Sequence, residues 1–176
     1  MKMLREAARK RALELMYRGY HWGPSILQVM WEAYDLGNED FLWAGIPFLG
    51  GIGGVQNAPC GVVSASAVCL GLRHRCSLSD KEQAKQARHA IRALSAKIVT
   101  EFNQHFGDIT CRGLIKMDFS KPGEYQKFLE SGIWKDKCVK YVEFMMDKLY
   151  ELETDRELFV MAPSWNKGGA TFVLKL

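Results

Sequence analysis

The feature that most restricts how this chain can fold is a run without any charged side chain, from position 41 to position 72. A helix that spans a membrane needs about 20 consecutive, predominantly apolar residues, so the length of the run raises that possibility. Pro47, Pro59 and the glycine-rich segment at 50–54 interrupt the run, however, and lipid does not tolerate exposed irregular backbone. We therefore predict no membrane span and expect the run to be buried inside a helical protein.

Composition and length predict one globular domain. The 176 residues are 48% hydrophobic and 25% charged, which is a typical balance, and the length suits a single core. Charged side chains spread through residues 2–14 leave no apolar segment for a secretory signal, so we expect a cytoplasmic protein. The five cysteines are then expected to be reduced, and their odd, widely spaced set favours chemistry or core packing over a disulfide framework.

Apolar residues repeat at helical spacing along most of the chain. We predict a mainly α-helical domain over residues 1–155, with a helix start near Cys111 and helices over 3–20, 24–36, 39–44, 60–72, 81–106, 124–129 and 134–152. Residues 156–176 form a separate extension, in which runs of β-branched and aromatic residues at 158–161 and 171–174 predict a short β-hairpin.

Three cysteines stand at or near predicted helix starts, namely Cys60, Cys111 and Cys138. The free N–H groups and the positive dipole end of a helix N-terminus stabilise a thiolate. A lowered thiol pKa makes a cysteine a nucleophile, a redox group or a metal ligand. The alternative is that a cysteine packs as a small hydrophobic residue, which we favour for Cys69, whereas Cys76 lies among basic residues and neither reading is favoured.

Small residues form one stripe of the helix predicted over 60–72, at positions Cys60, Ser64, Ala67 and Gly71. Side chains at this spacing lie on the same face of a helix. We therefore expect that this stripe allows another backbone or a flat group to approach the helix closely.

The spacing of other motifs excludes several classes of site. The glycines at 50–54 match neither a dinucleotide fingerprint nor a P-loop, so they predict a tight loop between helices. No C-x-x-C occurs, so any shared metal or thiol site must be assembled by the fold. A basic stripe without interleaved aromatic residues predicts a solvated helix face and no nucleic-acid partner; it comprises Lys81, Lys85, Arg88 and Arg92.

Several segments together resemble one known family. They are Arg18-Gly19-Tyr20, the glycine-rich segment at 50–54, Cys60-Gly61, Leu70-Gly71-Leu72, Phe106-Gly107, Cys111-Arg112 and the helical Cys138. Over about residues 10–152 the chain resembles the C_GCAxxG_C_C family, a helical group with four cysteines whose name records a redox role without defining a reaction. The resemblance implies that Cys60, Cys111 and Cys138 are the second, third and fourth of these cysteines.

The chain also departs from the family pattern. Trp22 stands where the resemblance expects the first cysteine, Pro59 replaces a glycine before the second cysteine, and Ala65-Ser66 replaces a later glycine. The matching positions therefore supply three thiols where the family pattern has four.

The resemblance implies a site in which Cys60 is the most activated thiolate and the other two cysteines are resolving partners or co-ligands. An iron–sulfur cluster or another metal would receive three thiolates, with His21 as a candidate fourth ligand. Side chains or backbone bordering such a cofactor are expected from Trp22, Gly53 and Gly54. A disulfide site would instead need two cysteine Cα atoms within about 7 Å.

Three functions stay open on these grounds. The chain is a thiol–disulfide oxidoreductase or electron-transfer protein, a redox protein with a metal, or a degenerate, non-enzymatic member that acts as a binding or oligomerisation module. The sequence does not define a redox partner, and a homo-oligomer is compatible with it.

Overall fold

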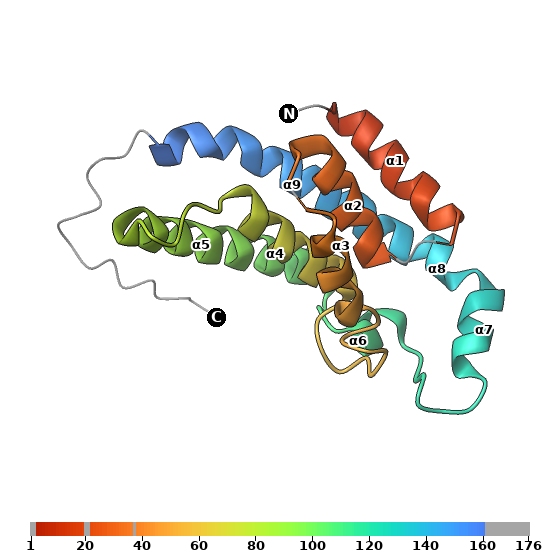
Figure 1. The fold of residues 1–176 in the computed structure, drawn as a ribbon. Coiled ribbons are helices and arrows are strands. Elements are labelled where there is room, and N and C mark those ends of the chain that lie inside the picture. Colours follow the sequence, from red (N-terminus) through yellow and green to blue (C-terminus); the bar gives the residue numbers. More distant parts are fainter. Residues whose placement is uncertain (1–2, 20–21, 37, 161–176) are drawn as a thin grey trace.

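A computed structural model describes residues 3–19, 22–36 and 38–160 of the chain (Figure 1). The helices are α1 (Arg5–Tyr17), α2 (Trp22–Tyr34), α3 (Asp40–Gly45), α4 (Gly61–Arg73), α5 (Lys81–Phe106), α6 (Cys111–Ile115), α7 (Glu124–Ser131), α8 (Ile133–Asp136) and α9 (Cys138–Val160), with a 3-10 turn η1 (Ile46–Phe48). Within these ranges the chain forms no β-strand, although an isolated bridge pairs Pro59 with Thr110. The predicted mainly α-helical fold is confirmed.

The longer helices enclose one hydrophobic core. α9 contacts α1, α2, α4 and α5, and α2 also packs against α1 and α4. Fully buried side chains from four of these helices, namely Ile26, Leu70, Phe102 and Met145, belong to a single cluster. Figure 1 shows α6, α7 and the glycine-rich loop between η1 and α4 together at one end of this bundle. That end is built from loops and short helices, which the longer helices hold in place.

Local sequence explains where α5 and α6 begin and end. The Asp80 carboxylate accepts a hydrogen bond from the Gln83 N–H (3.0 Å) at the start of α5. The Thr110 hydroxyl accepts one from the Gly113 N–H (3.1 Å) at the start of α6. Gly107 ends α5 in the left-handed region, with φ of 79°, where a residue without Cβ is favoured. The predicted bounds of the long helix and the predicted next helix start are confirmed.

Two predictions about the C-terminal part differ from the structure. The helix predicted over 134–152 is divided into α8 and α9, because the backbone of Lys137 leaves regular helix geometry (φ −104°, ψ −63°). The strand predicted at 158–161 is wrong over 158–160, where α9 continues, since adding residues to an existing helix is easier than starting a new element. The rest of the predicted hairpin lies outside the described residues. The domain boundary after residue 155 stays a prediction and falls inside α9.

α2 and α4 approach each other closely at their first turns. A Cβ on Gly23 would lie 2.7 Å from the Gly61 carbonyl oxygen, and a Cβ on Gly61 would lie 2.9 Å from the Phe48 carbonyl oxygen. A Cβ on Gly71, by contrast, would meet open space. The predicted contact along the small-residue stripe is therefore wrong at Gly71, because the close approach is at the N-terminal end of α4.

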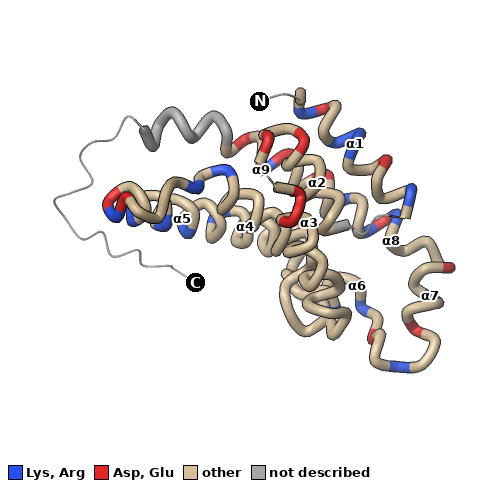
Figure 2. The backbone as a smooth tube through the Cα atoms, viewed as in Figure 1, with Lys and Arg blue, Asp and Glu red and all other residues tan. Residues whose placement is uncertain are grey.

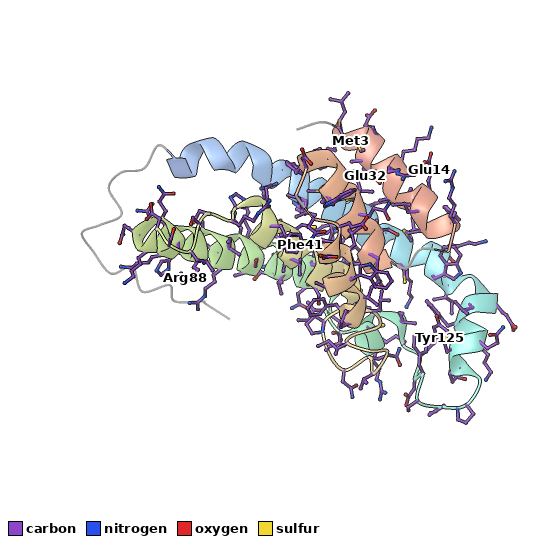
Figure 3. All side chains as sticks on the ribbon, in the orientation of Figure 1. Met3, Glu14, Glu32, Phe41, Arg88 and Tyr125 are labelled. Atoms are coloured by element: carbon purple, nitrogen blue, oxygen red, sulfur yellow. The ribbon has the colours of Figure 1, made fainter. Side chains whose placement is uncertain are left out.

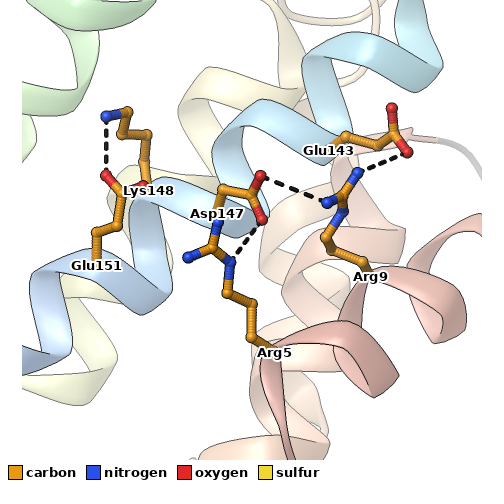
Figure 4. Close-up of polar contacts among 6 residues, drawn as sticks. All are labelled: Arg5, Arg9, Glu143, Asp147, Lys148 and Glu151. Carbon is orange, nitrogen blue, oxygen red and sulfur yellow. Dashed lines mark hydrogen bonds and ion pairs between the residues drawn. The ribbon is translucent and has the colours of Figure 1, made fainter.

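Ion pairs join α1 to α9 at the surface (Figure 4). Arg5 Nε lies 2.9 Å from an Asp147 oxygen, and Arg9 lies 2.9 Å from Glu143 and 3.6 Å from Asp147. Partly exposed pairs of this kind each contribute about 0–1 kcal/mol. The buried Ala8 on the same helix points to apolar packing as the main force that holds α1 on the core.

Charge is distributed unevenly over the fold. Figure 2 shows acidic and basic residues along α1 and α5 and none in the glycine-rich loop. In the predicted basic stripe of α5, Lys81, Lys85 and Arg92 are exposed, in agreement with a solvated face. Arg88 of this stripe lies on the opposite side of the molecule from Tyr125 of α7 (Figure 3). No helix among the described residues combines the length and the hydropathy that crossing a bilayer requires.

Candidate functional site

One cavity of about 300 Å³ lies between the glycine-rich loop, α4, α6, α7 and α9. Cys60, Cys111 and Cys138 all line it. The remaining lining residues are apolar or aromatic, or are glycines, and comprise Gly23, Leu49, Gly50, Gly54, Gly61, Val62, Leu114, Ile115, Phe119, Tyr125 and Tyr141. The fold thus brings three thiols from distant parts of the chain to one apolar space.

Each of these cysteines stands at the start of a helix. Cys60 is the N-cap residue of α4, Cys111 is the first residue of α6, and Cys138 is the first residue of α9. The predicted placement at helix starts is therefore confirmed. Three helix N-termini, each with a positive dipole end, meet at the same cavity.

Backbone pairing places Cys60 beside Cys111. The Cys60 N–H donates to the Ile109 carbonyl (2.7 Å), and the Cys111 N–H donates to the Ala58 carbonyl (3.4 Å), on either side of the bridge between Pro59 and Thr110. Side chains alternate between the two faces of an antiparallel pair, so residues 60 and 111 lie on the same face. Diagonal neighbours on one face are about 7–8 Å apart between Cα atoms, and somewhat less between Cβ atoms.

Gln56 makes hydrogen bonds next to this pair of segments, although no sequence pattern pointed to it. Its side chain is fully buried. Its Oε1 accepts a hydrogen bond from the Phe119 N–H (2.6 Å), and its Nε2 lies 4.0 Å from the Cys111 sulfur as a donor. Its backbone carbonyl accepts from the Arg112 N–H (3.0 Å). A buried amide with several partners links the glycine-rich loop to α6 and to the segment after it, and such links can be found only from the folded structure.

We expect Gln56→Met to lower the free energy of unfolding by about 1–3 kcal/mol, because the buried Phe119 N–H loses its acceptor while the side-chain volume is nearly kept. Denaturant unfolding measures this change. Gln126→Met is the matched control, because the Gln126 side chain is exposed and donates its hydrogen bond to the exposed Glu130 on the same helix. The control is expected to change stability by less than about 0.5 kcal/mol. Equal effects of the two substitutions would contradict a special role for Gln56.

Lys137 and Tyr141 tie α9 to α6. The Lys137 ammonium donates to the carbonyl oxygens of Leu114 (2.9 Å) and Ile115 (3.4 Å), and the Tyr141 hydroxyl donates to the Leu114 carbonyl (3.4 Å). These carbonyls lie at the C-terminal end of a helix, where they lack partners within the helix. The contacts fix the start of α9, and hence Cys138, against the cavity.

Burial opposes the thiol activation that the sequence predicts for Cys60. Burial of its sulfur raises the pKa of the thiol to about 12, although the residue as a whole is partly exposed. Hydrogen bonds from the Val62 and Val63 N–H groups act in the expected direction and lower the pKa, but by less. Removing a charge from water outweighs the helix N-terminus here. Burial therefore opposes the activation of the Cys60 thiolate, which stays a prediction.

The neighbouring groups are shifted for the same reason. Burial raises the pKa values of Cys111 and Cys138, with the Gln56 amide opposing it at Cys111 and the positive charge of Lys137 opposing it at Cys138. Burial, together with negative charge on the three cysteines, raises the pKa of Tyr141 to about 12. Burial thus disfavours the charged form of all three thiols.

The other predicted site residues are placed less centrally. Gly54 lines the cavity, whereas Gly53 is exposed and is absent from the lining. Trp22 is the first residue of α2, next to the cavity-lining Gly23, and His21 lies outside the described residues. Of the remaining cysteines, Cys69 is buried in the core, which agrees with packing.

A protein site for a metal ion needs several donor side chains close to one point. Within the described part of the chain, no three or more His, Cys, Asp or Glu side chains lie close enough together to hold one ion. The three cysteines as placed therefore do not fit a single-ion metal centre.

Comparison with known proteins gives one match. A family model described as "Putative redox-active protein (C_GCAxxG_C_C)" matches residues 23–152. The match contains all three cavity cysteines and begins directly after Trp22, the position at which the resemblance expected a further cysteine. No curated protein and no solved structure matches the chain.

Proposed function

The chain belongs to the C_GCAxxG_C_C family, and we propose that it is a two-electron redox protein in which Cys60 and Cys111 form a reversible disulfide. The observation that carries this proposal is that three thiols from three helix starts line one cavity. The pairing of residues 58–60 with 109–111 supports Cys60 and Cys111 as the bonding pair, because their side chains share one face. Diagonal neighbours are in general about 7–8 Å apart between Cα atoms, beyond the about 7 Å that a disulfide spans, so bond formation needs the two backbone segments to move closer together.

The reaction conserves atoms and electrons as a thiol–disulfide exchange. The Cys60 thiol first loses its proton, its thiolate attacks one sulfur of a disulfide substrate, the substrate S–S bond breaks, and the leaving substrate thiolate takes up a proton. The Cys111 thiol loses its proton in turn, its thiolate attacks the Cys60 sulfur of the mixed disulfide, and the second substrate thiolate leaves and takes up a proton. The two cysteine thiols are oxidised to one disulfide, and the substrate disulfide is reduced to two thiols.

Cys60 is placed first in this order because it is partly exposed as a residue, whereas Cys111 and Cys138 are only 5% and 4% exposed, although the Cys60 sulfur is itself buried. Cys138 lines the same cavity and is a second candidate for the resolving thiol. Because burial keeps the thiols protonated, both protons leave with the two electrons on oxidation.

The direct test is an anaerobic redox titration of the full chain with thiol counting and peptide mapping. We expect a single two-electron step that produces the disulfide Cys60–Cys111. Cys60→Ser and Cys111→Ser should each abolish this intramolecular step, while Cys76→Ser, outside the cavity lining, should leave it unchanged.

Two outcomes would overturn the proposal. If the purified protein carries stoichiometric iron or another metal that Cys60→Ser, Cys111→Ser and Cys138→Ser each remove, the site is a metal centre. If no oxidant yields the disulfide and the protein is free of metal, the chain is a non-enzymatic binding or oligomerisation module.

A further inference from the structure

Among the described residues, those that line the cysteine cavity carry no charged side chain. Arg112 and Lys137, next in sequence to the lining residues Cys111 and Cys138, are engaged elsewhere among the described residues, although the buried Nε of Arg112 has no partner there. The Lys137 ammonium donates to the Leu114 and Ile115 carbonyls, and an Arg112 Nη lies 2.8 Å from an Asp118 oxygen. An anion in the cavity would thus lose its water without gaining a free cation, which is strongly unfavourable.

Aromatic rings form one wall of the cavity. Phe119 and Tyr125 pack edge to face, with ring centroids 5.2 Å apart, and the Phe119 backbone is held by its hydrogen bond to Gln56. Tyr125 lines the cavity and is 42% exposed, so this wall also borders solvent. The ordered rings offer a flat apolar surface next to the thiols.

The size of the cavity and the burial of its thiols limit what can react there. Its volume of about 300 Å³ is at the small end of the range for organic ligands. Cys111 and Cys138 are almost fully buried, so a reactant must enter the space to reach them. The Cys60 sulfur is buried as well, so a reactant that fits inside the cavity, such as a small molecule, can occupy the volume that all three thiols line.

We infer that the oxidant of this site is a small, uncharged, apolar disulfide, aromatic or branched, which is reduced in the cavity to two thiols. This inference rests on the proposed function and adds the class of its substrate. The exchange is the balanced one given above: two cysteine thiols become one disulfide, and the substrate S–S bond becomes two S–H bonds. Disulfides with carboxylate groups are rejected, because no charged side chain lines the cavity among the described residues and the Val62 and Val63 N–H groups at the start of α4 already donate to the Cys60 sulfur.

A matched pair of chromogenic disulfides tests the charge preference. The neutral reagent dithiodipyridine and the dianionic reagent dithiobis(nitrobenzoate) are each reacted with the Cys76→Ser chain at one fixed pH. The reaction rate of each reagent with the folded chain is divided by its rate with the same chain unfolded in denaturant. This ratio removes the difference in intrinsic reactivity between the two reagents. We expect the normalised rate of the neutral reagent to exceed that of the dianion at least about tenfold, which corresponds to about 1.4 kcal/mol. A ratio near one overturns the inference.

A binding measurement separates this inference from the redox proposal. In a Cys60→Ser/Cys111→Ser chain, the fluorescent probe N-phenylnaphthylamine is compared with anilinonaphthalenesulfonate, which has the same ring skeleton and a sulfonate. We expect the neutral probe to bind at least about tenfold more tightly. Leu49→Trp, in the cavity lining, should weaken its binding, and Leu129→Trp, exposed and outside the lining, should not.

The two failures are distinguishable. If the neutral probe binds as expected but no disulfide oxidises Cys60 and Cys111, the proposed function fails. If both reagents oxidise the pair with equal normalised rates, or if both probes bind equally, the redox function stands and the inference of an uncharged apolar substrate fails.

Discussion

Gly23→Ala is expected to lower the free energy of unfolding by about 1–3 kcal/mol or more, although the change adds only one methyl group. The added Cβ would lie 2.7 Å from the Gly61 carbonyl oxygen and 3.0 Å from the Gly61 carbonyl carbon. Both contacts are with backbone, so no side-chain rotation relieves them, and α2 must move away from α4. Thermal or denaturant unfolding measures the effect. For a chain of this size, about 1 kcal/mol corresponds to a shift in Tm of about 2–4 °C.

Gly61→Ala and Gly71→Ala complete the comparison. Gly61→Ala should also destabilise, because its Cβ would lie 2.9 Å from the Phe48 carbonyl oxygen. Gly71 is inside α4 and a Cβ there meets open space, so Gly71→Ala should stabilise the protein by about 0.5–1 kcal/mol. The same substitution thus has opposite signs at the two ends of one helix. A stabilising effect at Gly23 would contradict the close approach of α2 and α4, and one at Gly61 would contradict the close approach of η1 to α4 beside Cys60.

The midpoint potential of the proposed Cys60–Cys111 couple is expected to fall by about 59 mV for each unit rise in pH. A tenfold change in the equilibrium constant of a two-electron couple is about 30 mV, and the release of two protons changes that constant about 100-fold per pH unit. Higher pH removes the released protons, so it favours the disulfide and lowers the potential. Because burial raises the pKa of Cys60 to about 12 and also raises that of Cys111, this slope should persist above the pH at which exposed thiols ionise.

Redox titrations against a thiol–disulfide buffer at a series of pH values measure this slope. The control is the same chain unfolded in denaturant, whose thiols ionise at about pH 8.5. Above that pH, the dependence of its midpoint potential on pH should become weaker. A break near that pH in the folded protein would show that Cys60 or Cys111 is ionised like an exposed thiol. That result would contradict the effect of burial at the cavity.

Helix starts were predictable because the signals that define them are local. Thr110 caps α6 with its own hydroxyl, and Gly107 ends α5 because it tolerates the left-handed region. The placement of Cys60 and Cys111 at helix N-termini followed from such signals. The division at Lys137 was not predictable, because its ammonium binds carbonyls of α6, which is distant in the sequence.

The amino-acid sequence by itself determined the helical class, most helix bounds and the three cysteines that share helix starts, because periodicity, caps and glycine stops act over a few residues. Tertiary structure alone decided that these thiols line one cavity, that Gln56 supports it and that Gly23 meets Gly61. It also decided the chemistry of Cys60. A helix N-terminus favours the thiolate, but the solvation lost on burial is larger, and burial depends on every element that packs around the sulfur.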